Sequence, residues 1–319
     1  MKDIYSNIFL FNKKTLNKTV KVLNKNRLVS LPTETVYGLA GNAYSRVAVE
    51  KIFKLKKRPK RNPIIIHYLD IQQAINDVVV NSNFKKLYKK FCPGPLTFIL
   101  KKNKKSKINS LAGAKLKTIA VRFPNHRVIR SILKNISYPL AMPSANISSS
   151  ISPVCAEDVY EEFKKKIQLI VDGGNSKVGI ESTVIDLTEE PKILRPGIIG
   201  YSKIEKILNI KIRSNTNNLK IKSPGMQKKH YSPGIPVKIN QKKADNKSAF
   251  VYLGKKFKSK KRFFSLSKSS NLNEAAKNLY KTLRLIKKHG YKRIQIEKIP
   301  LKGAGIAIND RIRRAASKK

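Results

Sequence analysis

Lys56 and Arg58 are cations placed two residues apart where a predicted helix gives way to a loop. Pro59 directly follows the pair and disfavours continuation of the helix. An arginine can bind two phosphate oxygens as a fork, and a lysine adds a point charge. The pair could therefore hold a polyphosphate, although in so basic a chain a solvated charge run stays an open alternative.

A second candidate lies in the predicted strand TIAVRFP. Thr118 and Arg122 are four residues apart, so both side chains point to the same face of the strand. Burying an arginine among apolar neighbours is costly unless an anion meets the guanidinium. The strand therefore predicts an anionic ligand at Arg122.

Other polar side chains follow predicted strands. LPTETVYGLAGNA places Thr33, Glu34 and Thr35 at a strand end, where open sheets often bind ligands, although a well-capped turn would look the same. His67 closes the strand PIIIHY, yet an isolated histidine more often packs in a core. No G-x-x-x-x-G-K-[ST] or G-x-G-x-x-G loop occurs, so the sequence supports neither a P-loop nor a dinucleotide-binding fold.

MPSANISSSISP places Ser144, Asn146, Ser148 and Ser152 behind a predicted strand, which gives donors of the kind that hold phosphate and ribose. GIESTVID and ILRPG add Ser182 and Arg195.

The net charge of the 319-residue chain is +50, from 69 Lys and Arg against 19 Asp and Glu. Such a charge attracts polyanions. The lysines are spread almost everywhere, together with many Asn and Ile, which favours compositional drift as their main source. Selection for an anionic partner such as tRNA stays open.

Cys92 and Cys155 are far apart and form no C-x-x-C pair, so neither a zinc site nor a disulfide framework is indicated. They fit a reducing compartment, and a cytoplasmic location is expected. The longest apolar runs are a few residues, far short of a membrane span, and little length is left for a removable presequence.

Helical and strand patterns alternate along the chain, which predicts a mixed α/β or α+β sheet covered by helices. The first domain is expected over residues 1–212. Residues 213–241 are rich in proline, glycine and polar residues and read as a linker. A smaller α/β domain is expected over 242–319, with a short last helix beginning in NDRIRRAA.

The ordered motifs resemble the L-threonylcarbamoyladenylate synthases in their long two-domain form. PTETVYGL, K-x-R, NPIIIH, PGPLTFIL, AVRFP, S-x-N, GIESTVID and ILRPG occur in the family's order, followed by SPGMQKKHYSP and GAGIAINDRIRRAA. The resemblance implies a YrdC-like twisted mixed sheet covered by helices, plus a smaller C-terminal Rossmann-like α/β domain. It also implies synthesis of threonylcarbamoyl-AMP and pyrophosphate from L-threonine, bicarbonate and ATP, with Mg²⁺ on the phosphates. The product would serve modification of the adenosine next to the anticodon in tRNA, so tRNA or the modification machinery is a further expected partner.

The resemblance also implies roles for residues at matching positions. The catalytic group would be Lys56, Arg58, Ser144 and Asn146. The ATP-binding group would be Arg58, Asn62, Thr118, Ser144, Ser152, Arg195 and Tyr231. The threonine-binding group would be Thr35, His67, Arg122, Met142 and Ser182. No protein ligand for the metal is assigned, and the linker, with His230 and Tyr231, is expected to close over the site.

The chain departs from the family pattern at three places: Ala40-Gly41 after VYGL, Ser149 where a glycine is usual, and Cys92 where an aromatic is usual. A serine is costlier than a glycine where φ is positive, so the Ser149 change bears on the backbone near ATP.

Two other functions are alternatives to this synthesis. A non-enzymatic RNA-binding module of the same fold would use the +50 charge. A related carbamoyl-transfer maturation protein would need zinc-finger cysteines, and this chain has too few.

Overall fold

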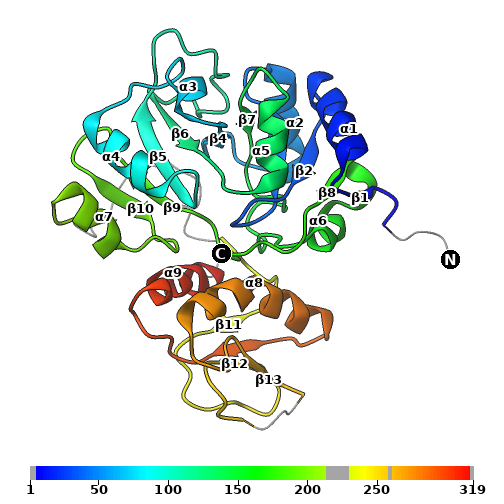
Figure 1. Ribbon diagram of the computed structural model, residues 1–319. Coiled ribbons are helices and arrows are strands. Elements are labelled where there is room, and N and C mark those ends of the chain that lie inside the picture. The colour runs from blue at the N-terminus through cyan, green and yellow to red at the C-terminus, as the bar shows by residue number, and fades with distance from the viewer. Residues whose placement is uncertain (1–4, 213–229, 258–260, 317–319) are drawn as a thin grey trace.

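The computed structural model describes residues 5–212, 230–257 and 261–316, which form two sheets with their helices (Figure 1). The strands of the first sheet are β1 (Ile8–Leu10), β2 (Val29–Leu31), β3 (Gly38–Asn42), β4 (Ile65–His67), β5 (Leu96–Lys101), β6 (Thr118–Arg122), β7 (Leu140–Ala141), β8 (Ile170–Asp172), β9 (Thr183–Asp186) and β10 (Lys192–Arg195). The helices around it are α1 (Lys13–Asn24), α2 (Arg46–Lys56), α3 (Ile71–Ala74), α4 (Ser82–Phe91), α5 (Arg127–Lys134), α6 (Ala156–Phe163) and α7 (Tyr201–Leu208).

The first sheet is mixed, in the order β1-β8-β2-β3-β7-β4-β6-β5-β9-β10. Its central strands are apolar runs with buried side chains, as expected for a sheet covered on both faces. Several helices begin at capping side chains: Asn12, Ser45 and Asn81 accept hydrogen bonds from backbone amides of α1, α2 and α4. The predicted mixed sheet covered by helices is confirmed.

Strand register decides which polar side chains meet. β4 and β6 are parallel neighbours, with His67 opposite Arg122. β5 runs antiparallel on the other side of β6 and places Thr97 opposite the same arginine. β9 follows β5 in parallel and begins directly after Ser182. Segments far apart in the sequence thus meet at one end of these strands.

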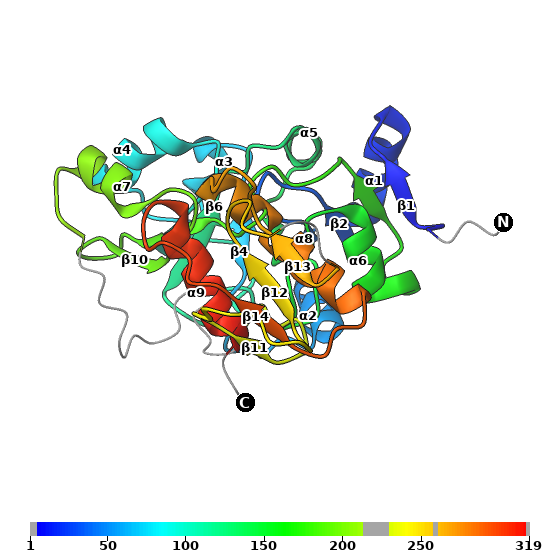
Figure 2. The same ribbon diagram turned by 90° about the horizontal axis from the view of Figure 1, so that it is seen from below.

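The second domain is a parallel sheet of β11 (Val237–Lys238), β14 (Ile294–Ile296), β12 (Ala249–Tyr252) and β13 (Phe263–Ser265), in that order. Its helices α8 (Leu272–Lys288) and α9 (Ala304–Ala316) lie between this sheet and the first domain (Figures 1 and 2). The Rossmann-like prediction fits this arrangement. The last helix was expected to be short, but it begins at Ala304 and runs for 13 residues.

The two domains share an apolar core. Val36, Val154 and Ile180 of the first domain pack in one buried cluster with α8 and α9, whose members include Leu279 and Ile308. Burial of this kind removes apolar surface of both domains from water, which favours their fixed association.

Gly179 of the first domain lies against the backbone of α8 at Lys277. Its φ is +78°, and a Cβ atom there would lie 2.4 Å from the carbonyl oxygen of Lys277. We expect Gly179→Ala to lower the free energy of unfolding by about 1–3 kcal/mol more than Gly174→Ala, because a clash with backbone adds to the cost of positive φ. Gly174 is the matched control, since its φ is +81° and a Cβ there would meet nothing within 4 Å. If denaturant melts gave the same loss of unfolding free energy for Gly179→Ala and Gly174→Ala, the contact between Gly179 and α8 would not be tight.

Part of the predicted linker, residues 213–229, lies outside the described residues. The described remainder, from His230, runs into β11. The domain boundaries 1–212, 213–241 and 242–319 stay a prediction. Within the described ranges, no helix is long and apolar enough to cross a membrane.

Candidate active site

One pocket gathers residues that are far apart in the sequence, from Thr33 to Tyr231. Half of the predicted site residues line it: Arg58, His67, Arg122, Met142, Ser144, Arg195 and Tyr231. Thr33, Tyr37, Gly38, Glu181 and His230 are among its other lining residues. The pocket therefore places candidate threonine-binding and candidate ATP-binding groups around one space.

Arg58 is positioned by the end of α2. Lys57 caps that helix in the left-handed conformation, with φ 49°. The Arg58 side chain then donates from Nε to the carbonyl of Asn62 at 3.0 Å and from Nη2 to the carbonyl of Pro63 at 2.6 Å. Burial lowers the pKa of Arg58 to about 9, which leaves the guanidinium charged at neutral pH. Two carbonyls fix its orientation without neutralising that charge, so Arg58 can meet an anion.

Lys56 is fully buried and does not line the pocket. Its Nζ donates to the carbonyl of Ser144 at 2.6 Å and to the carbonyl of Asn146. Burial, with the nearby Arg58 charge, holds the pKa of Lys56 well below its usual range. In this arrangement the two hydrogen bonds from Lys56 hold the backbone of the 144–146 segment in place. The contact of Lys56 with phosphate stays a prediction.

Arg122 meets an anion of the protein itself. Its Nη2 donates to Glu34 Oε1 at 2.7 Å, and both side chains are buried. Glu34 Oε2 also accepts from the backbone amide of Asn125 at 3.1 Å. The charge expected opposite this buried arginine is thus supplied by Glu34, whose role the sequence did not reveal. The Nε of Arg122 is buried and has no hydrogen-bond partner among the described residues.

His67 stands beside Arg122 and is also buried. Burial, together with the Arg122 charge, holds its pKa well below the usual range, so the imidazole is neutral at pH 7. A neutral ring can donate one hydrogen bond and accept another. Its Nδ1 lies 3.3 Å from the carbonyl of Ile65.

The segment 142–146 forms another wall. Met142 covers Gly38 so closely that a Cβ on the glycine would lie 2.5 Å from Met142 Cγ. Ser144 forms a β-bridge with Gly38. Asn146 donates from its side-chain nitrogen to the carbonyls of Ile147 and Ser150, while its Oδ1 is buried without a partner among the described residues.

Arg195 and Ser182 form the wall at β9 and β10. Arg195 donates from Nε to the carbonyl of Ser182 at 3.0 Å and from Nη2 to its Oγ at 3.1 Å. Ser182 Oγ also lies 2.7 Å from Thr97 Oγ1. Ser182 itself is fully buried and does not line the pocket, so it orients Arg195 in this structure.

His230 and Tyr231 close the pocket from the described end of the linker. Both are buried, with their rings 4.1 Å apart, and Tyr231 has φ 61°. The ring of Tyr231 stacks on Tyr280 of α8 at 5.8 Å. The Tyr231 hydroxyl has no partner among the described residues. The segment is anchored by Ser232, whose amide donates to the carbonyl of Ser149 at 2.8 Å.

The other predicted residues lie outside the pocket lining. Thr35 Oγ1 lies 2.9 Å from Thr33 Oγ1, and it is Thr33 that lines the pocket. Asn62 contacts Arg58, and Ser152 contacts Glu181. Thr118 opens β6, four residues and therefore about 13 Å along the strand from Arg122. The roles assigned to these residues stay predictions.

Glu181 is a lining residue that sequence reasoning missed, although it lies in the quoted motif GIESTVID. It is buried, and burial opposes ionisation. The charges of Arg311 and Arg195 and a hydrogen bond from Ser152 outweigh that penalty, so the pKa of Glu181 is lowered to about 2. Only the fold reveals the partners of this carboxylate, because Arg311 is 130 residues away in sequence.

The titration of His230 gives a pH prediction. Burial lowers its pKa to about 3. Between pH 6.5 and 3 the unfolded chain takes up a proton there that the folded protein does not, so stability is lost as pH falls through this range. From pH 7 to 5 the free energy of unfolding should drop by at most about 2 kcal/mol from this group.

His230→Gln should flatten that dependence, and His289→Gln is the control because His289 is exposed. Urea melts at pH 7, 6 and 5 provide the comparison. The same slope in both variants would contradict the assignment to His230.

Comparison with known proteins identifies relatives over nearly the whole chain. A family model described as "Telomere recombination" matches residues 21–197, and one described as "Threonylcarbamoyl-AMP synthase, C-terminal domain" matches residues 199–317. The threonylcarbamoyl-AMP synthase of Pyrococcus abyssi is 36% identical, with 92% of each chain covered. That of Bacillus subtilis is 33% identical, covering 96% of this chain and 94% of the relative.

A solved structure agrees with these matches. The crystal structure of P. abyssi Sua5 complexed with L-threonine has a TM-score of 0.87 and 33% identity, with 97% of each chain covered. These findings confirm the family predicted from the ordered motifs. The chain belongs to the threonylcarbamoyl-AMP synthase family, in the form that carries a second, C-terminal domain.

Proposed function

We propose that the protein synthesises L-threonylcarbamoyladenylate and pyrophosphate from L-threonine, bicarbonate and ATP. The observation that carries the proposal is that Arg58, Arg122 and Arg195 line the same pocket as a neutral His67. Relatives named for this synthesis cover nearly the full chain, and one related structure is described with L-threonine bound. An enzyme is therefore favoured over a non-enzymatic RNA-binding module.

The proposed reaction needs no covalent intermediate on the protein. The threonine amine forms a bond to the carbon of bicarbonate with loss of water, which gives a carbamate. A carbamate oxygen then attacks the α-phosphorus of ATP, and pyrophosphate leaves with the electrons of the broken P–O bond. Catalysis would rest on positioning and on neutralising charge in a site shielded from water.

The chain's cations divide between the substrates in this proposal. The ion pair with Glu34 would orient Arg122, and its Nε, which has no partner among the described residues, would donate to the threonine carboxylate. His67 would form a hydrogen bond to the same substrate. Arg58 and Arg195 would meet the nucleotide. Asn146 Oδ1 and the Tyr231 hydroxyl are unpartnered within the described residues and could hydrogen-bond to the nucleotide or the product.

Mg²⁺ is expected to arrive with ATP. Among the described residues, no group of three or more His, Cys, Asp or Glu side chains could hold a metal. Glu181 is the only carboxylate among the described residues that line the pocket, and it accepts a hydrogen bond from Arg311. This donor set fits a magnesium ion held by substrate phosphates and water, which is the usual mode for nucleotide enzymes. The ion would offset negative charge on the phosphates.

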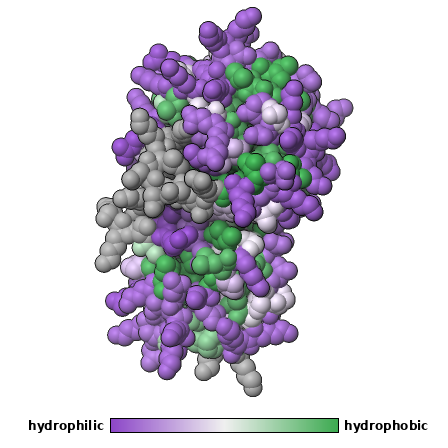
Figure 3. Space-filling model, turned by 90° about the vertical axis from the view of Figure 1, so that its left-hand side faces the viewer, coloured by the Kyte–Doolittle hydropathy of each residue, from purple (hydrophilic) through white to green (hydrophobic). Residues whose placement is uncertain are grey.

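The product is proposed to serve modification of the adenosine next to the anticodon, with tRNA or its modification machinery as a partner. Hydrophilic residues cover both domains on the face in Figure 3 and form no single stripe. A cytoplasmic location remains a prediction.

The test is to incubate the purified chain with ATP, Mg²⁺, bicarbonate and labelled L-threonine. Pyrophosphate and a threonylcarbamoyl-AMP peak should form together, and omission of any one substrate should abolish both. No product, together with tight and salt-sensitive RNA binding that survives Lys56→Ala, would favour the RNA-binding alternative.

A further inference from the structure

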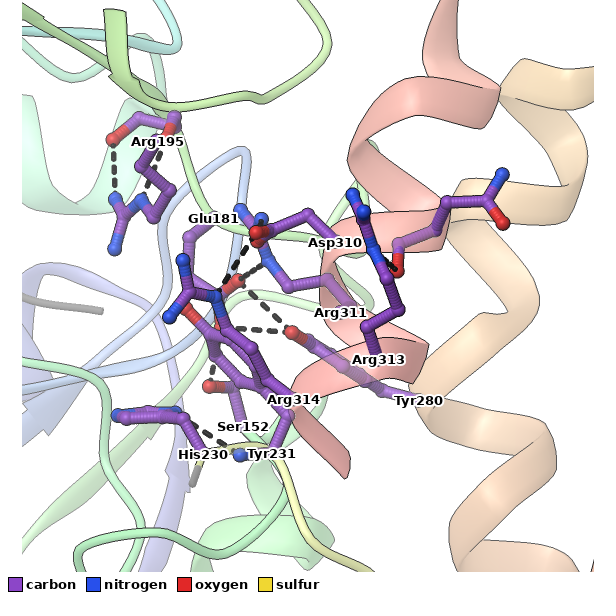
Figure 4. A network of polar contacts seen from close by, with 12 residues as sticks. Ser152, Glu181, Arg195, His230, Tyr231, Tyr280, Asp310, Arg311, Arg313 and Arg314 are labelled. Carbon is purple, nitrogen blue, oxygen red and sulfur yellow. Dashed lines mark hydrogen bonds and ion pairs between the residues drawn. The ribbon is translucent and has the colours of Figure 1, made fainter. Parts of the chain in front are cut away.

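Glu181 links the pocket to the C-terminal domain. Its carboxylate accepts from Ser152 Oγ at 2.5 Å, from the hydroxyl of Tyr280 at 2.9 and 3.1 Å, and from Arg311 Nε at 2.8 Å (Figure 4). Ser152 belongs to the first domain, whereas Tyr280 and Arg311 come from α8 and α9. A carboxylate in the pocket wall therefore receives its cation from the other domain.

Arg311 is unusually enclosed for a charged residue, with 1% of its surface exposed. Its Nη1 donates to Asp310 Oδ2 at 2.6 Å, in addition to the contact with Glu181. Its guanidinium carbon lies 5.1 Å from the centre of the Tyr231 ring, within the range of a cation–π contact. Arg311 thus contacts two lining residues, Glu181 and Tyr231, without lining the pocket itself.

The charge of Glu181 matters because of what shares its pocket. Arg58 and Arg195 line the same space and suit an anionic ligand. A buried carboxylate in that wall would repel a phosphate unless a cation neutralised it, and such repulsion is strong where water is excluded.

We propose that Arg311 is a positioning residue for the nucleotide: it neutralises Glu181 and seats the Tyr231 ring, and so makes the pocket accept a polyphosphate. The identity of that ligand as ATP rests on the proposed function. The sequence did not reveal the purpose of the C-terminal domain. In this proposal the domain supplies the positive charge that balances Glu181, in addition to packing against the first domain.

A double-mutant cycle separates charge neutralisation from a mere clamp between domains. Arg311→Gln should weaken binding of ATP with Mg²⁺ by at least about tenfold, because it removes the cation that contacts the Glu181 carboxylate directly. In the E181Q background the same substitution should weaken binding by less than about threefold, since no charge is left to neutralise. Equal losses in the two backgrounds would overturn the proposal and leave only a clamp.

The readout is the dissociation constant for ATP, measured by titration calorimetry on the full chain without threonine or bicarbonate. Arg311→Lys should retain most of the affinity that Arg311→Gln loses, because it keeps the charge. Comparison of Arg311→Lys with Arg311→Gln also tests the proposal if the E181Q proteins do not fold, and equal losses of affinity in these two variants would overturn it. Arg46→Gln is the control: Arg46 pairs with Glu50 on the surface, with 80% of its side chain exposed, and ATP binding should not change.

The measurement distinguishes failure of this inference from failure of the proposed synthesis. Suppose that the variants lose ATP affinity as expected in the two backgrounds, but the wild-type protein releases no pyrophosphate. That result would refute the synthesis and leave Arg311 in its role. A wild-type protein that makes the product but shows no difference between the two backgrounds would do the reverse. No binding of ATP by the wild type would overturn the inference directly.

Discussion

Replacing Arg122 by alanine should raise the threonine concentration needed for half-maximal rate by about 10- to 100-fold and change the ATP requirement little. The lost hydrogen bond to a carboxylate is worth about 1.5–3 kcal/mol. The structure adds a second effect, because Arg122 and Glu34 form a buried ion pair at 2.7 Å. Removing one partner leaves a buried carboxylate unpaired, which should cost about 3–5 kcal/mol of stability.

A second variant separates these two effects. Arg122→Met combined with Glu34→Gln removes both charges, so it should recover most of the stability lost by Arg122→Ala. It should not recover threonine binding if Nε of Arg122 holds the substrate. Steady-state kinetics with each substrate varied in turn, together with urea melts, would test this. Equal rises in the threonine and ATP requirements would count against the assigned role.

Lys56→Met should abolish most activity and lower the free energy of unfolding by about 2–4 kcal/mol. The substitution leaves the carbonyls of Ser144 and Asn146 without their shared donor, and an unsatisfied buried group costs about 1–3 kcal/mol. The 144–146 segment would then shift, and Ser144 lines the pocket. Thermal melts and the pyrophosphate assay measure the two effects.

Lys60→Met is the control for this prediction. Lys57, Lys60 and Arg61 belong to the same charge run but are exposed, so removing one of these charges should matter little. A Lys56→Met protein that keeps its stability and loses only ATP affinity would indicate that Lys56 turns to the phosphates when substrate binds.

The sheet and its helices were largely predictable because apolar periodicity survives in this basic chain. The predicted strand TIAVRFP contains β6, and the predicted strand PIIIHY contains β4. β3 was missed, since Gly38–Asn42 reads GLAGN, and glycine and asparagine are poor strand formers. Pairing with β2 and β7 decides its conformation, and such pairing is not visible in a local pattern.

The candidate site was predictable as a set of residues, but its pairings were not. The need for an anion at Arg122 was visible, whereas Glu34 as that anion depends on a contact across 88 residues. Glu181 gave no signal of its own because its cation comes from the other domain.

The departure at Ser149 was visible in the sequence, and the structure shows the positive φ on which its expected cost depends. Ser149 has φ +74°, a conformation that favours glycine. Its carbonyl holds the amide of Ser232, which anchors the segment carrying Tyr231. The segment that closes the pocket is therefore anchored to a residue with a strained backbone conformation.

The long sequence separations in the pocket also bear on how the protein is made. Lys56 reaches Asn146 across 90 residues, and Arg311 reaches Glu181 across 130. Contacts this distant in sequence form slowly, because the entropy of closing the loop is lost before the contact compensates for it. During synthesis on the ribosome, the first domain can assemble its sheet while Glu181 still lacks its cation. If Arg311 neutralises Glu181 as proposed, the pocket would accept a nucleotide only after α9 has been synthesised, and a nascent chain without α9 would not sequester this substrate.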